Sequence, residues 1–156
     1  MNRAPYRAGA DTDWDAVLSL IRGAFAFMDG RIDPPSSMHA LTEAGVAEQA
    51  QSGEVWLIGT APAACVFLSA RPPVLYIGKL AVAAPMRRRG LAQALMAVAD
   101  ARARALGLPV LQLQTRIELV ENHATFRAMG FHQTAATAHP GFDHPTSLTF
   151  ERRVPT

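Results

Sequence analysis

The chain has 156 residues, of which 49% are hydrophobic, and its formal net charge is +2. This length fits one domain, residues 1–156, which can bury enough surface to fold without a disulfide or a structural metal. No apolar run approaches the roughly 18 residues that span a bilayer, and Cys65 is the single cysteine. We therefore expect a cytoplasmic protein without a membrane partner, and the small net charge gives no reason to expect nucleic-acid binding.

Strand-like and helix-like patterns alternate along the chain, which is typical of an α/β protein. The first half is predicted to hold, in order, a short strand over 5–9, a helix over 14–28, a proline-containing loop over 30–37 and a modest helix over 38–51. Three strands joined by tight turns follow over 54–59, 62–70 and 74–82, as in an antiparallel meander. The second half is predicted to hold a helix over 91–106, a strand over 110–115, a helix over 122–129 and strands over 131–138 and 147–153.

The most informative segment is the basic turn between the third of these strands and the long helix. It reads Ala84-Pro85-Met86-Arg87-Arg88-Arg89-Gly90-Leu91-Ala92. A helix N-terminus leaves about four backbone N–H groups unpaired and carries a partial positive charge, so it attracts anions. The small residues Gly90 and Ala92 allow a phosphate to approach the backbone, and the arginines add charge. This pattern predicts a phosphate or pyrophosphate site, although neither a Walker motif nor a dinucleotide fingerprint is present.

The arginine run resembles the Gln/Arg-x-x-Gly-x-Gly/Ala motif of GNAT-superfamily acetyltransferases, and a second segment supports the resemblance. The stretch from Asn122 to Phe131 resembles the Asn-x-x-Ala-x-x-Phe/Tyr-x-x-x-Gly-Phe element of the last core helix in that superfamily. The resemblance is strong over 74–132. It implies a GNAT fold: a central mixed, mostly antiparallel sheet of six to seven strands, splayed between the fourth and fifth strands and flanked by about four helices.

By this resemblance, the protein is an N-acetyltransferase with acetyl-coenzyme A as co-substrate and no metal. The backbone of the strand before the turn would pair with the pantetheine arm, amides of the turn would hold the pyrophosphate, and the later helix would contact the pantetheine and thioester. The implied cofactor-binding residues are Leu80, Ala81, Val82, Arg87, Arg88, Arg89, Gly90, Leu91, Ala92, Asn122 and Phe126.

The implied reaction is direct attack of a neutral amine on the acetyl thioester in a ternary complex. The backbone N–H of Leu80 would polarise the carbonyl. Many superfamily members carry a tyrosine proton donor at the position of Phe126, which has no proton to give. By period-2 counting, Tyr76 lies on the same strand face as Leu80 and is a candidate acid. Glu118 is a candidate base or substrate contact, and capping or surface roles remain open for it.

The acceptor is expected to be the primary amine of a small molecule, because two rigid loops flank the splay. Either loop, 29–37 or 139–146, can supply recognition, or can simply connect elements. Candidate contacts are carboxylates for a cationic amine and arginines for a carboxylate: Asp29, Asp33, Asp143, Arg31 and Arg116. Protein or peptide acceptors remain an alternative, as does a coenzyme A-binding module with little catalysis.

Two further expectations concern histidines and assembly. His123, His139 and His144 show no metal-site spacing and are expected at the surface or in turns. A homodimer is possible, with 147–153 as an edge strand that pairs between chains.

Overall fold

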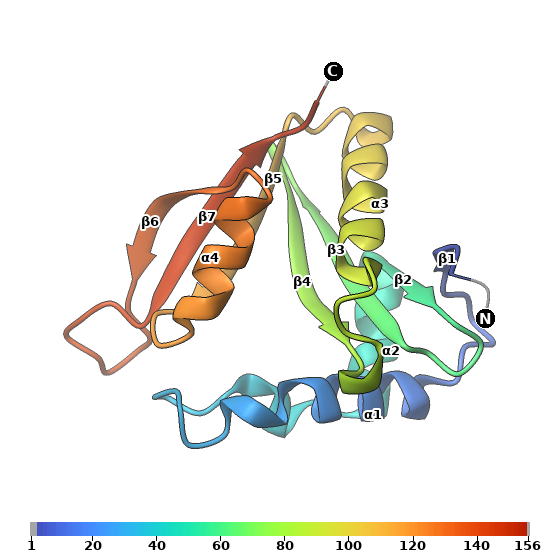
Figure 1. Cartoon of the computed structure of the whole chain (residues 1–156), viewed down its shortest axis with the longest axis horizontal. Helices are drawn as coiled ribbons and strands as arrows, with labels where there is room; N and C mark the ends of the chain where they lie inside the picture. Colours follow the sequence, from blue (N-terminus) through green and yellow to red (C-terminus); the bar gives the residue numbers. More distant parts are fainter. Residues whose placement is uncertain (1–2, 156) are drawn as a thin grey trace.

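The computed structural model describes residues 3–155, which form a single seven-stranded sheet between two layers of helices (Figure 1). The strand order is β1-β2-β3-β4-β5-β7-β6. Every neighbouring pair is antiparallel except β4 and β5, which are parallel. The predicted mixed, mostly antiparallel sheet with about four flanking helices is confirmed.

The first half of the chain follows the predicted order, and most of its elements other than β4 are shorter than predicted. These elements are β1 (Tyr6–Arg7), α1 (Trp14–Phe25), two 3-10 turns (Ala26–Met28 and Ser37–Ala40), α2 (Glu43–Ser52), β2 (Glu54–Ile58), β3 (Ala64–Arg71) and β4 (Val74–Val82). The helix predicted over 38–51 is divided because Leu41 is extended, and α2 restarts at Thr42, whose side chain accepts a hydrogen bond from the Gly45 N–H.

The second half begins with a 3-10 turn and the longest helix. Its elements are the turn Ala84–Met86, α3 (Leu91–Leu106), β5 (Val110–Arg116), α4 (Val120–Ala128), β6 (His132–Thr137) and β7 (Ser147–Arg153). Helix α3 lies between two glycines in the left-handed region, Gly90 with φ +79° and Gly107 with φ +71°. Both positions favour glycine because a Cβ is strained there.

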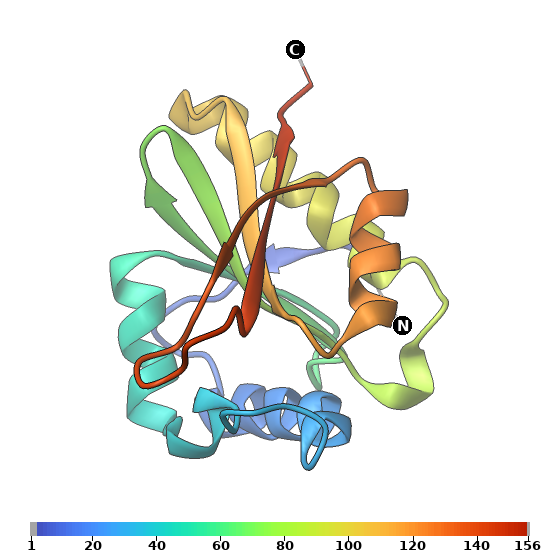
Figure 2. The same cartoon turned by 90° about the vertical axis from the view of Figure 1, so that its left-hand side faces the viewer.

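The helices cover opposite faces of the sheet (Figures 1 and 2). On one face α1 and α2 pack over a core that includes Val17, Ile21 and Val46. On the other face α3 packs over a larger core with Leu95 and Phe150, and α4 rests on its rim. No helix among residues 3–155 is long and apolar enough to cross a membrane.

The sheet splits between its two parallel strands, as predicted. Strands β4 and β5 pair from Val74↔Val110 to Ile77↔Leu113 and then diverge, and Figure 1 shows the opening between them. Beyond Ile77, β4 continues to Val82 without a partner on this side, while β5 stays paired with β7 as far as Arg116. Among the described residues, this edge of β4 therefore has no strand partner beyond Ile77 and faces an open wedge, where the Val82 carbonyl accepts a hydrogen bond from the Arg87 side chain.

A β-bulge at the start of this wedge corrects one prediction. On β3, Val66 lies opposite both Lys79 and Leu80, because the flanking pairs are Phe67↔Gly78 and Cys65↔Ala81. The extra residue reverses the alternation of faces. Leu80 therefore packs on the α3 side, as Ile77 does. Tyr76 alternates with Ile77 and lies on the opposite face, so the prediction that Tyr76 and Leu80 share a face is wrong.

The predicted edge strand is also wrong. Strand β7 is paired on both sides, with β5 and with β6. The exposed edge at this end of the sheet belongs to β6, where all residues from His132 to Thr137 are exposed. Assembly of two copies remains a prediction, but 147–153 has no free edge with which to make it.

Candidate functional site

Two cavities meet at the wedge between β4 and β5. The larger, about 800 Å³, opens toward the N-terminus of α3. The smaller, about 620 Å³, opens toward α1 and the segment 35–41. Four residues line both cavities: Phe25, Leu80, Asn122 and Phe126. A ligand in one cavity therefore lies close to a ligand in the other, which is the arrangement that group transfer requires.

The larger cavity has the backbone features of an anion site. Arg88 and Gly90 both adopt positive φ angles, +63° and +79°, as the chain turns into α3. Gly90 is the N-cap residue and brings no side chain to the first amides of the helix. An added Cβ on Gly90 would meet nothing within 4 Å, so the space before these amides is open. Backbone N–H groups and the helix dipole are thus in place for the predicted phosphate cradle, and phosphate binding there stays a prediction.

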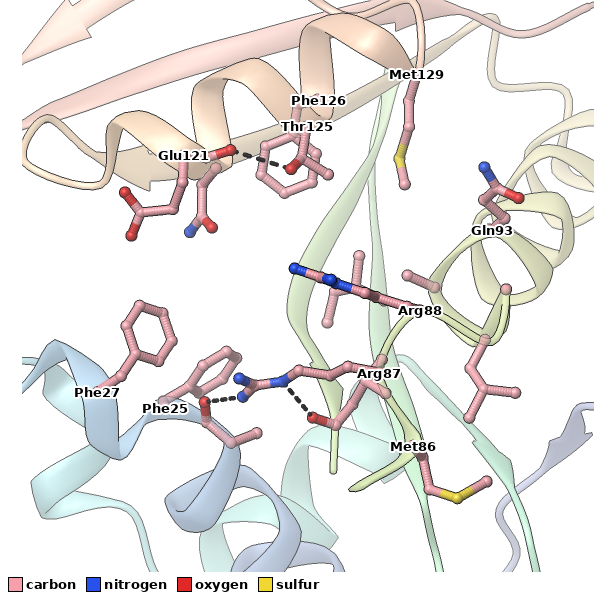
Figure 3. A pocket seen from close by; sticks show the side chains of 17 residues that line it. Phe25, Phe27, Met86, Arg87, Arg88, Gln93, Glu121, Thr125, Phe126 and Met129 are labelled. Atoms are coloured by element: carbon pink, nitrogen blue, oxygen red, sulfur yellow. Dashed lines mark hydrogen bonds between the residues drawn. The ribbon is translucent and has the colours of Figure 1, made fainter. Parts of the chain in front are cut away.

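The three arginines of the turn differ in their contacts, and two of them, Arg87 and Arg88, line the cavity as predicted. Arg88 extends into the cavity (Figure 3). Arg87 lines the cavity as well, but its guanidinium is bonded to the backbone: its Nη2 donates to the Ala24 carbonyl at 3.0 Å and its Nε to the Val82 carbonyl at 3.4 Å. Arg89 does not line the cavity. Arg88 therefore supplies a charge without a bonded partner among these contacts, and Arg87 adds a charge that also joins the end of α1 to the turn.

One face of α4 forms the opposite wall. The predicted Asn122 and Phe126 line it, and so do Thr125 and Met129, which the sequence analysis missed (Figure 3). These four positions follow helical spacing: Thr125 is three residues after Asn122 and Met129 is three residues after Phe126, so counting helical neighbours of the two predicted residues would have found both. On the facing strand, Leu80 and Val82 line the cavity as predicted, but Ala81 is buried in the core under α1.

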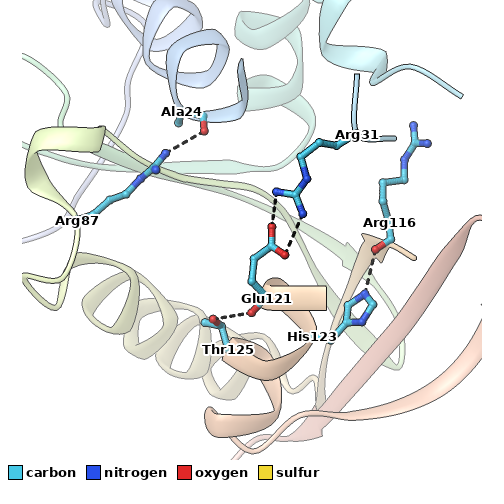
Figure 4. A network of polar contacts seen from close by, with 7 residues as sticks. All are labelled: Ala24, Arg31, Arg87, Arg116, Glu121, His123 and Thr125. Atoms are coloured by element: carbon cyan, nitrogen blue, oxygen red, sulfur yellow. Dashed lines mark hydrogen bonds and ion pairs between the residues drawn. The ribbon is translucent and has the colours of Figure 1, made fainter. Parts of the chain in front are cut away.

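The end of α1 closes the cavity with aromatic rings. Phe25 and Phe27 both line it (Figure 3), and no pattern in the sequence indicated either. Nearby, Arg31 pairs with Glu121 through two contacts of 2.6 and 3.0 Å (Figure 4). The hydrogen bond from Arg31 holds the pKa of Glu121 below its ordinary value. The ion pair joins the 29–37 loop to the start of α4 and neutralises the carboxylate that lines this cavity.

The smaller cavity is mostly apolar and carries two cations. Lys79 and Arg116 line it, together with Tyr76 and the polar side chains of Gln49 and His139. Arg116 donates to the carbonyls of Pro34 and Pro35 at 2.6 and 3.2 Å, and burial lowers its pKa. Arg116 therefore holds the loop that covers this cavity.

The predicted acceptor contacts of the loops lie outside both cavity linings, apart from Arg116. Asp29 bonds His39 at 2.8 Å, and Asp143 bonds His144 at 3.0 Å with a fully exposed carboxylate. Arg31 is paired as described, and Asp33 donates its backbone N–H to Glu118 at 3.0 Å. The structure does not bring these groups together around a ligand.

Glu118, the candidate base, has a structural contact of its own. Its Oε2 accepts the Asp33 N–H, and its Oε1 is buried without a hydrogen-bond partner among the described residues. Glu118 lines neither cavity, so its role in proton transfer stays a prediction. It contributes negative charge beside Arg116 and fixes the 29–37 loop.

Two of the predicted histidines have different surroundings: His123 is buried in the fold, and His139 lines the smaller cavity. His123 is buried rather than at the surface: its Nε2 lies 2.9 Å from the Arg116 carbonyl (Figure 4). The centre of its ring lies 5.8 Å from that of Phe150. His139 lies beside the smaller cavity and contacts Thr146. Within residues 3–155 there is no group of three or more metal-ligating side chains.

The comparison with protein families decides the assignment. Residues 14–131 match the model of the acetyltransferase (GNAT) family. The chain belongs to the GNAT family. The match includes both motifs and α4.

Solved structures share the fold at low sequence identity. The ribosomal-protein-S18-alanine N-acetyltransferase from Escherichia coli matches with a TM-score of 0.69 and 15% identity over 97% of this chain and 95% of that chain. Ard1 from Thermoplasma volcanium matches with a TM-score of 0.72 and 19% identity over 98% of this chain and 99% of that chain. A Bacillus subtilis acetyltransferase in complex with CoA matches with a TM-score of 0.66 and 16% identity over 98% of this chain and 99% of that chain. No curated protein matches the sequence.

Proposed function

We propose that this GNAT protein transfers the acetyl group of acetyl-coenzyme A to the amine of a small molecule. The observation that carries the proposal is the pair of cavities that meet at the β4–β5 wedge and share Leu80, Asn122 and Phe126. One cavity has an anion cradle and the other has a half-buried cation in an apolar wall. This arrangement suits an anionic acyl donor on one side and an acceptor on the other.

The larger cavity suits acetyl-coenzyme A in its size and in the N–H groups that it offers for hydrogen bonds. Amides of residues 90–92 and the Arg88 guanidinium would hold the pyrophosphate. The open edge of β4 at Leu80 and Val82 would pair with the amides of the pantetheine arm, as an added strand does. Phe25 and Phe126 would surround the thioester and exclude water from it.

The chemistry then follows from the amine in the smaller cavity. Its nitrogen attacks the thioester carbonyl carbon, a C–N bond forms, and the C–S bond breaks with the electron pair passing to sulfur. The attacking nitrogen loses one proton and the sulfur gains one, so the products are an acetamide and a free thiol. The backbone N–H of Leu80 would stabilise the developing oxyanion.

Two features support a small acceptor rather than a peptide. The segment from Pro35 to Leu41 lies along the smaller cavity and is held by Arg116, so this side is walled rather than an open groove. The volume of about 620 Å³ is that of a small-molecule site.

The test is thiol release from acetyl-coenzyme A across amino acids, polyamines, aminoglycosides and short peptides. We expect turnover with one small-molecule class and none with peptides. Turnover confined to peptides would reverse the choice of acceptor. Binding of acetyl-coenzyme A without thiol release from any amine would favour a binding module with little catalysis.

A further inference from the structure

Lys79 lines the smaller cavity, which is proposed to hold the acceptor, and has an unusual backbone conformation. It is the single lysine of the chain, and it sits in the β4 bulge with a φ of +48°. A left-handed conformation is unfavourable for any residue with a Cβ, and glycine would adopt it more easily. A strained lysine next to Leu80, where the oxyanion is expected to form, points to a use for the side chain itself.

The ammonium group of Lys79 has neutral neighbours. Its Nζ donates to Gln49 Oε1 at 2.8 Å and lies 5.2 Å from the centre of the Phe67 ring. Among residues 3–155 it makes no ion pair. Burial lowers its pKa below the ordinary 10.5. A half-buried cation without a counter-ion is costly, and an anionic ligand would remove that cost.

The remaining charges of this cavity leave Lys79 as the cation available to a ligand. Arg116 is bonded to two loop carbonyls and lies near the carboxylates of Glu118 and Asp33. No aspartate or glutamate lines the cavity. A cationic acceptor group would therefore meet positive charge and find no carboxylate, whereas an anionic group would find Lys79.

Resting on the proposed function, we propose that the acceptor is an amino acid whose carboxylate binds Lys79 and Gln49 and whose side chain is apolar. The lysine donates through Nζ, and the Gln49 amide nitrogen adds a second donor, since its oxygen already accepts from Lys79. This mode of binding requires the amine to extend from the bound carboxylate toward Leu80, which lines the same cavity. The side chain extends among apolar groups, of which Ile21, Met28, Met38, Leu113 and Leu119 line the cavity.

The first experiment compares matched acceptors: leucine, leucinamide and 3-methylbutylamine, with the phenylalanine series in parallel. Leucine is expected to react with about a 10- to 100-fold higher kcat/KM than leucinamide, the range of one hydrogen bond to a charged group. The amine of the amide is less basic and more of it is neutral, so a greater supply of free amine cannot produce this preference.

Three variants assign the preference to the side chain. Lys79→Met keeps the apolar stem and removes the charge, and it should raise KM for the amino acid about 10- to 100-fold while leaving 3-methylbutylamine within about twofold. Lys79→Arg should restore part of the preference because it keeps the charge. Arg153→Met, which removes an exposed cation at the opposite end of the sheet, should match the parent protein.

A binding measurement covers the case in which neither series turns over. N-acetylleucine and its amide, titrated calorimetrically into the protein with coenzyme A, represent the product. The acid should bind at least 10-fold more tightly, and Lys79→Met should abolish the difference. Equal binding of acid and amide, or neither binding while coenzyme A does, overturns the proposal. Loss of coenzyme A binding and of thiol release would instead overturn the proposed function.

Discussion

At the scale of single residues, helix α3 offers a matched pair. Gly90 and Gly107 flank the same helix, both have φ between +70° and +80°, and neither has an atom within 4 Å of an added Cβ. The two glycines differ in their relation to the larger cavity, which Gly90 lines and Gly107 does not. Any shared effect of substitution therefore reports backbone strain, and any difference reports the ligand.

We predict that Gly90→Ala and Gly107→Ala each lower the free energy of unfolding by about 1–2 kcal/mol, the cost of a left-handed alanine. Gly90→Ala should also raise KM for acetyl-coenzyme A about tenfold, because the methyl group occupies space before the first amides of α3. Urea unfolding and steady-state kinetics measure the two effects. An equal change in KM for both variants would contradict the cradle.

Glu118 separates a catalytic role from a structural one. A glutamine at this position still accepts the Asp33 N–H but cannot act as a base at neutral pH. Because Glu118 lines neither cavity, we predict that Glu118→Gln keeps kcat within about threefold. Loss of a general base would lower it by about 10²- to 10⁴-fold. A loss of that size, with the acidic limb of the pH–rate profile removed, would establish Glu118 as the base.

At the scale of elements, strand β4 shows what the sequence could and could not predict. Its range, Val74–Val82, and the splay beside it were expected correctly. The bulge was not, because Lys79 carries no signature of a left-handed residue, and one extra residue reversed the faces of everything after it. Period-2 counting is reliable only within an uninterrupted ladder, so Tyr76 was misplaced relative to Leu80.

The candidate site was predictable where two motifs fix it and not where tertiary contacts do. The cradle at Gly90 and the wall at Asn122 and Phe126 follow from local patterns. Phe25 and the diversion of Arg87 to Ala24 depend on where α1 ends relative to the turn, which is set by long-range packing.

Helix α3 is fastened to the sheet on both sides of the splay by ion pairs. Arg102 donates to both oxygens of Glu54 in β2 at 2.8 Å, and Asp100 accepts from Arg152 in β7 at 2.9 and 3.0 Å. Glu54 is buried and also accepts from Trp56. The hydrogen bonds from Arg102 hold the pKa of Glu54 below its ordinary 4.5. The helix that carries the cradle therefore depends on a charged carboxylate.

We predict that this contribution to stability is present above pH 4.5 and is lost as the pH falls through the lower pKa of folded Glu54. The sign follows because the unfolded state binds the proton more readily. Urea unfolding at several pH values should show a shallower acid slope for Glu54→Gln. Arg102→Met should cost about 1–3 kcal/mol at pH 7, because it leaves a buried carboxylate with fewer donors.

Arg104→Met is the control on the same helix. Arg104 is exposed and bonds only the Pro155 carbonyl, so its loss should change the free energy of unfolding by less than about 0.5 kcal/mol. If Glu54→Gln kept the acid slope of the parent protein, the pH dependence would arise from other carboxylates.

At the scale of the whole molecule, the sheet consists of two parts joined by a short parallel ladder. Strands β1–β4 and β5–β7 meet only over 74–77 and 110–113. Beyond this ladder the parts are linked through α3 and through contacts such as Arg31–Glu121 and Arg116–Pro34. A donor in the wedge would touch both parts, the edge of β4 on one side and α4 on the other.

We therefore predict that acetyl-coenzyme A stabilises the whole fold. At 100 times its Kd it should add about 2.7 kcal/mol, which for a domain of this size corresponds to a rise in Tm of about 5–10 °C. Hydrogen exchange should slow at residues 80–82 and 90–93, where the ligand amides and phosphates would accept or donate. The exposed edge strand β6 should be unchanged.

Removing a charge at the cradle is the control for the predicted rise in Tm. Arg88→Met should reduce the rise in Tm and its dependence on salt, because Arg88 extends into the cavity while Arg87, which also lines it, is bonded to the Ala24 and Val82 carbonyls. Arg153→Met should leave both unchanged. Exchange protection confined to β6 would place acetyl-coenzyme A elsewhere on the molecule. So would a rise in Tm that persists when Arg88→Met and Gly90→Ala are combined. Slowed exchange on both β4 and α4 would instead show that one ligand joins the two parts of the sheet.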